Sequence, residues 1–249
     1  MTAASPPSVE DIARRGHCSG CGLCQSVSGG AIQVSLNDTG YMRPATTAPA
    51  EASALRTILS VCPGVSVTTP ASETPIDPLW GPIESLMIGH ATDPQIRFTG
   101  SSGGVITATA TYLLTSGAVD AVVTNRVNPE DPLGNQSFVA TTAEELLEAA
   151  GSRYAPSAPL RDIVQIAQTY ERICFVGKPC DIAALRAYTA VNPLIAERIQ
   201  YYLGFFCAGI PSRKGGRRRG HPTGHGRGPG DRVPIPRQWL ARAHRRQNR

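Results

Sequence analysis

The spacing of apolar residues predicts short elements near the N-terminus. Residues 9–15 have the pattern of a helix, with Ser8 as N-cap and Asp11 as its capping-box partner. Residues 32–36 alternate apolar and polar side chains, which predicts a strand, and the turn sequence at residues 37–40 returns the chain as a second strand. A further helix is expected over residues 51–60, with Leu55, Ile58 and Leu59 facing inward.

From residue 86 onward, the pattern alternates between apolar strands and amphipathic helices. This alternation is typical of an α/β domain with a mainly parallel sheet. The expected fold class is therefore α+β or α/β, with a small module over residues 1–66, a Pro-rich linker over 67–84 and an α/β domain over 85–212. Strands are expected over residues 86–91, 118–124, 136–140, 173–176 and 201–206, and helices over 105–114, 143–150, 161–172 and 181–188.

Four cysteines carry the strongest chemical signal. Cys18, Cys21 and Cys24 are separated by two residues each, and a remote Cys62 precedes Pro63. Three crowded thiols and a distant fourth can each bond one iron of a [4Fe–4S] cube. Zinc sites more often use two Cys-x-x-Cys pairs or Cys and His mixtures, and thiols unrelated to any metal are the other alternative. The sequence therefore predicts a ferredoxin-like [4Fe–4S] module over residues 1–66.

Two polar loops of the second region are candidates for phosphate binding. Residues 99–104 are small and precede the helix expected at Val105, so that backbone N–H groups at the helix start are open to an anion. An ordinary glycine-rich helix start is the alternative. In the loop at residues 151–157, Arg153 can pair with a phosphate and Tyr154 can stack on a flat ring. A plain surface turn explains this loop equally well.

Two further cysteines follow neighbouring strands of the predicted sheet. Cys180 opens a helix just after Lys178, and both features are expected to lower the pKa of its thiol. Cys207 follows the strand at residues 201–206. Because the carboxyl ends of parallel strands form the ligand crevice of an open sheet, the two thiols are candidate ligands of a second cluster. They are alternatively small core residues, which is the expected role of Cys174.

Charge divides the chain into an acidic body and a basic end. The formal net charge is +5, yet residues 213–249 hold 12 of the 24 Lys and Arg residues and only one, Asp231, of the 19 acidic residues. This stretch of Arg, Gly, Pro and His buries too little apolar surface to fold, so disorder is expected. The abrupt change in composition favours a frameshifted or truncated reading frame. A genuine basic arm is the alternative, and it would make the protein a metal-bearing module that binds nucleic acid.

Targeting signals are not expected in this sequence. No run of 18 apolar residues is present, so no membrane span is predicted, and the first residues lack the apolar region of a signal peptide. Seven cysteines without such a signal indicate a reducing compartment, where thiols serve metal or redox chemistry. A cytoplasmic location is therefore expected.

In combination, these segments resemble the coenzyme F420 hydrogenase/dehydrogenase beta-subunit family. The matching stretches are residues 18–24 with Cys62-Pro63, then 98–105, 151–157, 176–186 and 203–207, in this order. The resemblance implies an iron–sulfur flavoprotein that carries FAD beside one or more [4Fe–4S] clusters. Such a protein passes electrons between a redox partner protein or ferredoxin and a small organic substrate such as coenzyme F420.

The resemblance also implies roles for individual residues. The family domain continues well past Cys207, whereas this chain becomes basic there, so an incomplete flavin pocket and an inactive fragment are among the expectations. No general acid or base is assigned. The first cluster is expected on Cys18, Cys21, Cys24 and Cys62 and a flavin-proximal second cluster on Cys180 and Cys207, with flavin contacts from Thr99, Gly100, Ser101, Ser102, Gly103, Gly104, Arg153, Tyr154 and Lys178.

Overall fold

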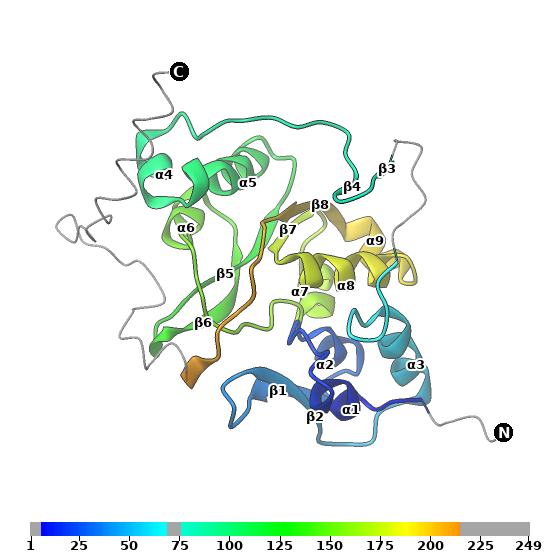
Figure 1. Cartoon of the computed structure of the whole chain (residues 1–249). Helices are drawn as coiled ribbons and strands as arrows, with labels where there is room; N and C mark the ends of the chain where they lie inside the picture. Colours follow the sequence, from blue (N-terminus) through cyan, green and yellow to red (C-terminus); the bar gives the residue numbers. More distant parts are fainter. Residues whose placement is uncertain (1–5, 69–75, 215–249) are drawn as a thin grey trace.

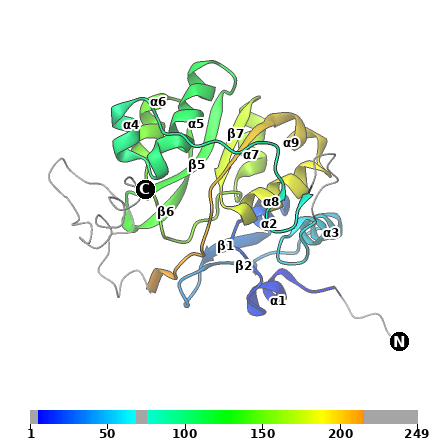
Figure 2. The same cartoon turned by 45° about the horizontal axis from the view of Figure 1, so that its top comes forward.

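The chain folds as a mixed α+β protein in which one sheet carries helices on both faces. A computed structural model describes residues 6–68 and 76–214 (Figure 1). The sheet lies at the centre, and the N-terminal elements form a further layer against one end of the molecule (Figures 1 and 2). In the described ranges, no helix combines the length and the apolar character needed to cross a bilayer.

The N-terminal region contains three short helices and a β-hairpin. The capping box predicted at Ser8 and Asp11 is present, and the predicted hairpin pairs its strands antiparallel with Val34 opposite Pro44. Ile58 is buried as expected, but Leu55, one turn before it, is exposed, and Val61, one turn after it, is buried. The elements are α1 (Val9–Arg14), α2 (Leu23–Val27), β1 (Ile32–Leu36), β2 (Met42–Thr46) and α3 (Ala52–Val61).

The central sheet has four strands in the order β6-β5-β7-β8. Strands β5 (Ala121–Asn128), β7 (Ile173–Gly177) and β8 (Ile199–Gly204) are parallel, which confirms the expectation of a mainly parallel sheet. Strand β6 (Asp131–Ala140) is twice as long as the strand expected at residues 136–140 and pairs antiparallel with β5. A tight turn joins them, and the Asn128 side chain accepts a hydrogen bond from the N–H of Glu130 within it.

Helices cover both faces of this sheet. On one face, α5 (Val105–Thr115) and α6 (Ala143–Glu148) share a core with Val122 and Cys174, which confirms that Cys174 is buried. On the opposite face, Val123 and Phe175 pack in one core with α7 (Ile163–Thr169), α8 (Pro179–Thr189) and α9 (Pro193–Arg198). Leu23 and Val61 of the N-terminal region belong to that same core. The N-terminal region is therefore packed onto the helical layer rather than attached by a linker alone.

The segment between the two regions differs from the prediction. Residues 86–91 form no strand, and the side chains of Leu86, Met87 and Ile88 are exposed, because no other element covers this apolar run. The helix α4 (Pro94–Thr99) follows instead, with the Asp93 side chain capping its first N–H groups. Within the predicted linker, β3 (Ile76–Asp77) pairs with β4 (Gly81–Pro82).

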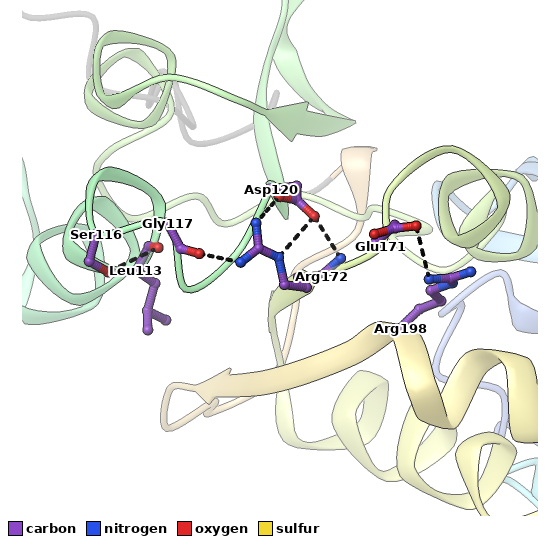
Figure 3. A network of polar contacts seen from close by, with 7 residues as sticks. All are labelled: Leu113, Ser116, Gly117, Asp120, Glu171, Arg172 and Arg198. Atoms are coloured by element: carbon purple, nitrogen blue, oxygen red, sulfur yellow. Dashed lines mark hydrogen bonds and ion pairs between the residues drawn. The ribbon is translucent and has the colours of Figure 1, made fainter.

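An exposed ion pair joins the starts of two neighbouring strands (Figure 3). Arg172, before β7, contacts the carboxylate of Asp120, before β5, with an Nη2 to Oδ1 distance of 2.5 Å. Its Nη1 also donates to the carbonyl oxygen of Gly117, just after α5. The hydrogen bond from the Arg172 side chain lowers the pKa of Asp120 below its ordinary value. One side chain thus connects the end of a helix to the first residues of two strands.

The predicted basic stretch begins inside the folded part of the chain. Arg213 is 7% exposed, its N–H donates to the carbonyl oxygen of Gly40 at 2.8 Å, and its guanidinium pairs with Asp131. Arg213, the first residue of the predicted basic stretch, thus contacts both the β1–β2 turn and the start of β6. The expected disordered tail and nucleic-acid arm otherwise lie outside the described residues.

Candidate iron–sulfur and flavin sites

The four N-terminal cysteines meet at one cavity. Cys18, Cys21, Cys24 and Cys62 all line a cavity of about 40 Å³. The first three lie in the loop before α2 and in its first turn, whereas Cys62 caps the C-terminus of α3. Two adjacent helices and one hairpin therefore bring together thiols that lie 38 residues apart in the sequence. The cavity walls are mostly apolar and include Val9, Ile12, Val34, Pro44, Ile58, Val61 and Ala184.

The cysteine loop depends on two glycines with left-handed backbone. Gly20 has φ +74° and Gly22 has φ +90°. A Cβ at Gly20 would lie 2.8 Å from the carbonyl oxygen of Met42, and one at Gly22 would lie 2.9 Å from the backbone nitrogen of Arg161. Any larger residue would both strain the backbone and collide with main chain. The loop is thus held between the β1–β2 hairpin and the segment that precedes α7.

Burial favours the protonated form of the Cys21 and Cys24 thiols. Burial raises the pKa of Cys24 to about 12, and the neighbouring thiols of Cys18 and Cys62 add to this shift. Burial also raises the pKa of Cys21, and the carboxylate of Asp181 adds to it. Bringing thiolates together in an apolar cavity is unfavourable unless a positively charged group compensates them. The donor set therefore fits a metal cluster whose irons supply that charge.

The positions of the four cysteines can be compared with the needs of a single zinc ion and of a [4Fe–4S] cluster. Among the residues that the structure describes, no group of three or more Cys, His, Asp or Glu side chains is positioned to hold a single metal ion. A tetrahedral zinc site needs its ligands to converge on one point. In a [4Fe–4S] cube each thiolate bonds a different iron, so the four sulfurs surround a larger volume. All four cysteines line one cavity, as either arrangement requires, and the choice of a cube rests on the spacing of the first three cysteines.

The structure brings the two predicted phosphate loops together. The hydroxyl of Ser152 donates to that of Ser101 at 2.6 Å, and a Cβ at Gly151 would lie 3.5 Å from the carbonyl oxygen of Thr99. Sequence analysis identified each loop separately and gave no signal that they touch. Thr99 ends α4 and does not belong to the start of α5, whereas residues 102–104 form the turn that enters it.

This turn has an unusual backbone. Ser102, Gly103 and Gly104 have φ values of +50°, +75° and +74° in succession. A Cβ at Gly104 would lie 2.6 Å from the carbonyl oxygen of Ile96, so glycine is required there for close packing against α4. The N–H of Gly104 already donates to the carbonyl oxygen of Ser101 at 3.0 Å, and a turn of this kind can present its other N–H groups to an anion. At Ser102, which is not glycine, this conformation carries strain of the kind that concentrates at binding sites.

Arg153 supplies the positive charge beside these loops. Its Nε and Nη1 atoms are buried, and neither has a hydrogen-bond partner among the described residues. Burial lowers the pKa of Arg153 from its ordinary value. A guanidinium remains charged even so, and donors buried without an acceptor are costly. This cost is removed by an anion bound in the loop, and the neighbouring Tyr154 is 62% exposed and available to a ligand.

Lys178 and the two remaining cysteines lie at the carboxyl ends of β7 and β8. The Nζ of Lys178 contacts Oδ2 of Asp181 at 2.5 Å, and their side chains are 7% and 0% exposed. Burial raises the pKa of Cys180, and the carboxylate of Asp181 raises it further, against the smaller opposing effect of Lys178. The expected lowering of the pKa of Cys180 is therefore wrong, because desolvation outweighs the lysine. Ser19 of the cysteine loop lowers the pKa of the Cys180 thiol through a hydrogen bond. Cys207, which is exposed, raises it.

A buried segment connects the two candidate sites. Residues 155–160 are buried throughout although they form neither helix nor strand. The N–H of Leu160 donates to the carbonyl oxygen of Cys21 at 2.9 Å, and the hydroxyl of Ser137 on β6 donates to the carbonyl oxygen of Ala158 at 3.0 Å. Nothing in the sequence indicated this connection. The role of Asp181 was also not predicted, although an acidic residue in the first turn of a helix that follows a buried strand was a visible signal.

Two family profiles match the chain. Residues 86–165 match the N-terminal part of the coenzyme F420 hydrogenase/dehydrogenase beta subunit, and residues 170–221 match its C-terminal part. Together the two profiles cover more than half of the sequence. The four N-terminal cysteines lie outside both matched ranges.

Individual relatives agree with these profiles. The chain is 30% identical over 128 residues to the coenzyme F420 hydrogenase subunit beta of Methanococcus voltae, which covers 51% of this chain and 42% of the relative. It is 33% identical over 124 residues to the coenzyme F420-dependent sulfite reductase of Methanocaldococcus jannaschii, covering 43% of this chain and 19% of the relative. The chain thus spans less than half the length of these curated relatives.

A solved structure of the F420-reducing [NiFe] hydrogenase complex from Methanosarcina barkeri aligns with a TM-score of 0.48 and 24% identity, over 50% of this chain and 44% of that one. The two profile matches follow each other in the same order along the sequence, and the relatives above carry the same family names. The chain belongs to the coenzyme F420 hydrogenase/dehydrogenase beta-subunit family.

Proposed function

We propose that this protein is the iron–sulfur flavoprotein subunit of an oxidoreductase. The observation that carries the proposal is the convergence of Cys18, Cys21, Cys24 and Cys62 on one apolar cavity. The relatives are named as a hydrogenase subunit and a sulfite reductase, both linked to coenzyme F420. A bound [4Fe–4S] cluster supplies one-electron exchange, and bound FAD supplies the two-electron exchange with an organic substrate.

At the first site the protein supplies ligands and excludes water. Each of the four cysteines loses its proton when it bonds iron, so cluster assembly releases protons and is favoured as pH rises. Gly20 and Gly22 hold the loop close to the hairpin, and the apolar walls limit solvent access. Low solvent exposure is one of the factors that set the potential of such a cluster.

At the second site the two polar loops hold the phosphates of the flavin. Arg153 would supply two buried donors to an anion, and its sequence neighbour Ser152 donates a hydrogen bond to the hydroxyl of Ser101. The left-handed turn at residues 102–104 offers backbone N–H groups to the same anion. The exposed ring of Tyr154 is available to stack on the isoalloxazine.

The segment between the sites holds them in a fixed relation. Residues 155–160 leave the flavin loop, cross the face of β6 and end with the hydrogen bond from Leu160 to Cys21. This continuous buried segment would hold a cluster and a flavin at a constant separation, as electron exchange between them requires. A ferredoxin or partner subunit is the proposed one-electron partner, and an F420-like deazaflavin is the proposed substrate.

Anaerobic purification followed by cofactor analysis tests the proposal. We expect about four iron atoms and four acid-labile sulfides per cluster, together with one FAD, and a spectrum that shows both chromophores. The reduced protein should also give the electron paramagnetic resonance signal of a [4Fe–4S] cluster. Oxidation of reduced F420 with methyl viologen as the electron acceptor tests the substrate. Reconstituted protein that holds neither iron nor flavin would refute the proposed function.

A further inference from the structure

The ion pair between Lys178 and Asp181 is buried, and it occupies the ammonium of Lys178, which the sequence predicted as a flavin contact. Its side chains are 7% and 0% exposed, and the Nζ to Oδ2 distance is 2.5 Å. Oδ2 also accepts a hydrogen bond from the backbone N–H of Lys178. The other carboxylate oxygen, Oδ1, is buried and has no partner among the described residues. The pair as a whole is neutral, but one oxygen of its carboxylate is a buried acceptor without a hydrogen bond.

Packing directs the carboxylate end of this pair toward the cysteines. The buried face of α8 consists of Asp181, Ala184, Leu185 and Tyr188. Ala184, one turn after Asp181, lines the cavity shared by the four cysteines. Leu185 packs in the same core as Leu23 and Val61, which are the direct sequence neighbours of cysteines at that cavity. Cys21 itself packs against this core.

We propose that the buried pair of Asp181 and Lys178 sets the reduction potential of the cluster held by the N-terminal cysteines, with Asp181 as the nearer and dominant charge. This inference rests on the proposed function, because it needs the cluster. Reduction adds one electron to a group that already carries the charge of four thiolates. A carboxylate held nearby in a low-dielectric interior opposes that electron, whereas an ammonium favours it. Both residues act as positioning charges and neither touches a reacting atom.

Redox titration of purified variants, followed by electron paramagnetic resonance, tests this inference. Asp181→Asn keeps an oxygen that can accept the N–H of Lys178 but removes the charge, so we expect a more positive midpoint potential than in the wild-type protein. The double variant Lys178→Met with Asp181→Asn removes both charges and leaves no unpaired ion to unfold the site. The midpoint potential of the double variant is expected to lie between those of the wild-type protein and of Asp181→Asn. Losing the more distant ammonium of Lys178 lowers the potential and so partly reverses the positive shift caused by Asp181→Asn.

The matched control for Asp181→Asn replaces a different aspartate that also pairs with a basic side chain. Asp120→Asn removes the carboxylate of the exposed pair with Arg172 and should leave the potential unchanged. Iron and sulfide are measured in every sample before titration. A wild-type protein without a cluster would refute the proposed function and this inference with it. A cluster present in all variants at one unchanged potential, or a double variant equal to the wild-type protein, would refute only the inference.

Discussion

Cys62 and Cys174 have different surroundings, so replacing each of them should have a different effect on metal content and stability. Cys62 lines the cavity shared with three other thiols, whereas Cys174 is buried in β7 among apolar neighbours. Cys62→Ala should therefore remove a ligand and lower the iron and sulfide content to a small fraction of the wild-type value. Cys174→Ala should retain the cluster and lower the free energy of unfolding by about 1 kcal/mol, because it only creates a small cavity.

Colorimetric iron and sulfide analysis on anaerobically reconstituted protein separates these outcomes. Full iron content in both variants would contradict the assignment of Cys62 as a ligand. Loss of iron from both would instead indicate that the fold had been damaged, and circular dichroism of each variant distinguishes that case.

Arg153 is the residue whose unmet hydrogen-bonding capacity predicts a bound anion. Two of its guanidinium nitrogens are buried without a partner in the described part of the chain. Arg153→Met keeps the length of the side chain but removes its donors, and we expect the affinity for FAD to fall roughly 10-fold to 100-fold, in line with the loss of a charge-assisted hydrogen bond. Flavin fluorescence during titration of the apoprotein measures this affinity.

The matched control for this variant is Arg186→Met. Arg186 is exposed on α8 and forms no ion pair within the described ranges. This variant loses the same charge at a site away from the two loops, so its flavin affinity should stay at the wild-type value. If both variants bind FAD as tightly as the wild-type protein, Arg153 is not a phosphate ligand.

At the level of elements, the exposed side chain of Arg172 connects the end of α5 with the starts of β5 and β7 through hydrogen bonds. Arg172→Met removes the contacts with Asp120 and with the carbonyl oxygen of Gly117 shown in Figure 3. Because the pair is exposed, we expect only a small decrease in melting temperature, on the order of a few degrees. Differential scanning calorimetry of the wild-type protein and the variant measures the difference.

The contribution of this pair should depend on pH in a defined direction. Arg172 lowers the pKa of Asp120 from its ordinary value of 3.8. A carboxylate whose pKa is lower in the folded state than in the unfolded state stabilises the protein fully at pH values above its unfolded-state pKa. This stabilisation is lost as the pH falls through the lower pKa of the folded state. The difference between wild-type protein and Arg172→Met should thus be constant near neutral pH and shrink below pH 3.8. A difference that grows on acidification would contradict the assignment.

Elements with local signals could be predicted from the sequence, and those that depend on distant contacts could not. The capping box at Ser8 and the helical pattern at residues 143–150 predicted two helix starts correctly. The apolar run at residues 86–91 resembles a strand, but apolar content does not report whether another element covers it, and Leu86, Met87 and Ile88 are exposed. Helix α4 carried a readable signal in Asp93 followed by Pro94, which the prediction overlooked.

The same distinction applies to the candidate sites. The spacing of the first three cysteines is local, so it identified their loop directly. The meeting of Ser101 with Ser152 and the burial of Asp181 arise from packing between segments far apart in the chain. The pKa of Cys180 was predicted in the wrong direction for the same reason, because sequence proximity to Lys178 says nothing about the degree of burial. The metal and flavin roles of these residues stay predictions.

At the scale of the whole molecule, the packing of the cysteine loop on the segment before α7 predicts a difference between two glycines. Gly22 and Gly29 both have positive φ, at +90° and +60°. A Cβ at Gly22 would lie 2.9 Å from the backbone nitrogen of Arg161, whereas one at Gly29 would have nothing within 4 Å. Gly29→Ala should therefore cost about 1 kcal/mol for the backbone conformation alone. Gly22→Ala should cost a further 1–3 kcal/mol, roughly, because backbone has to move. Urea unfolding followed by circular dichroism measures both values, and equal destabilisation of the two variants would mean that the N-terminal region does not pack closely on the α/β domain.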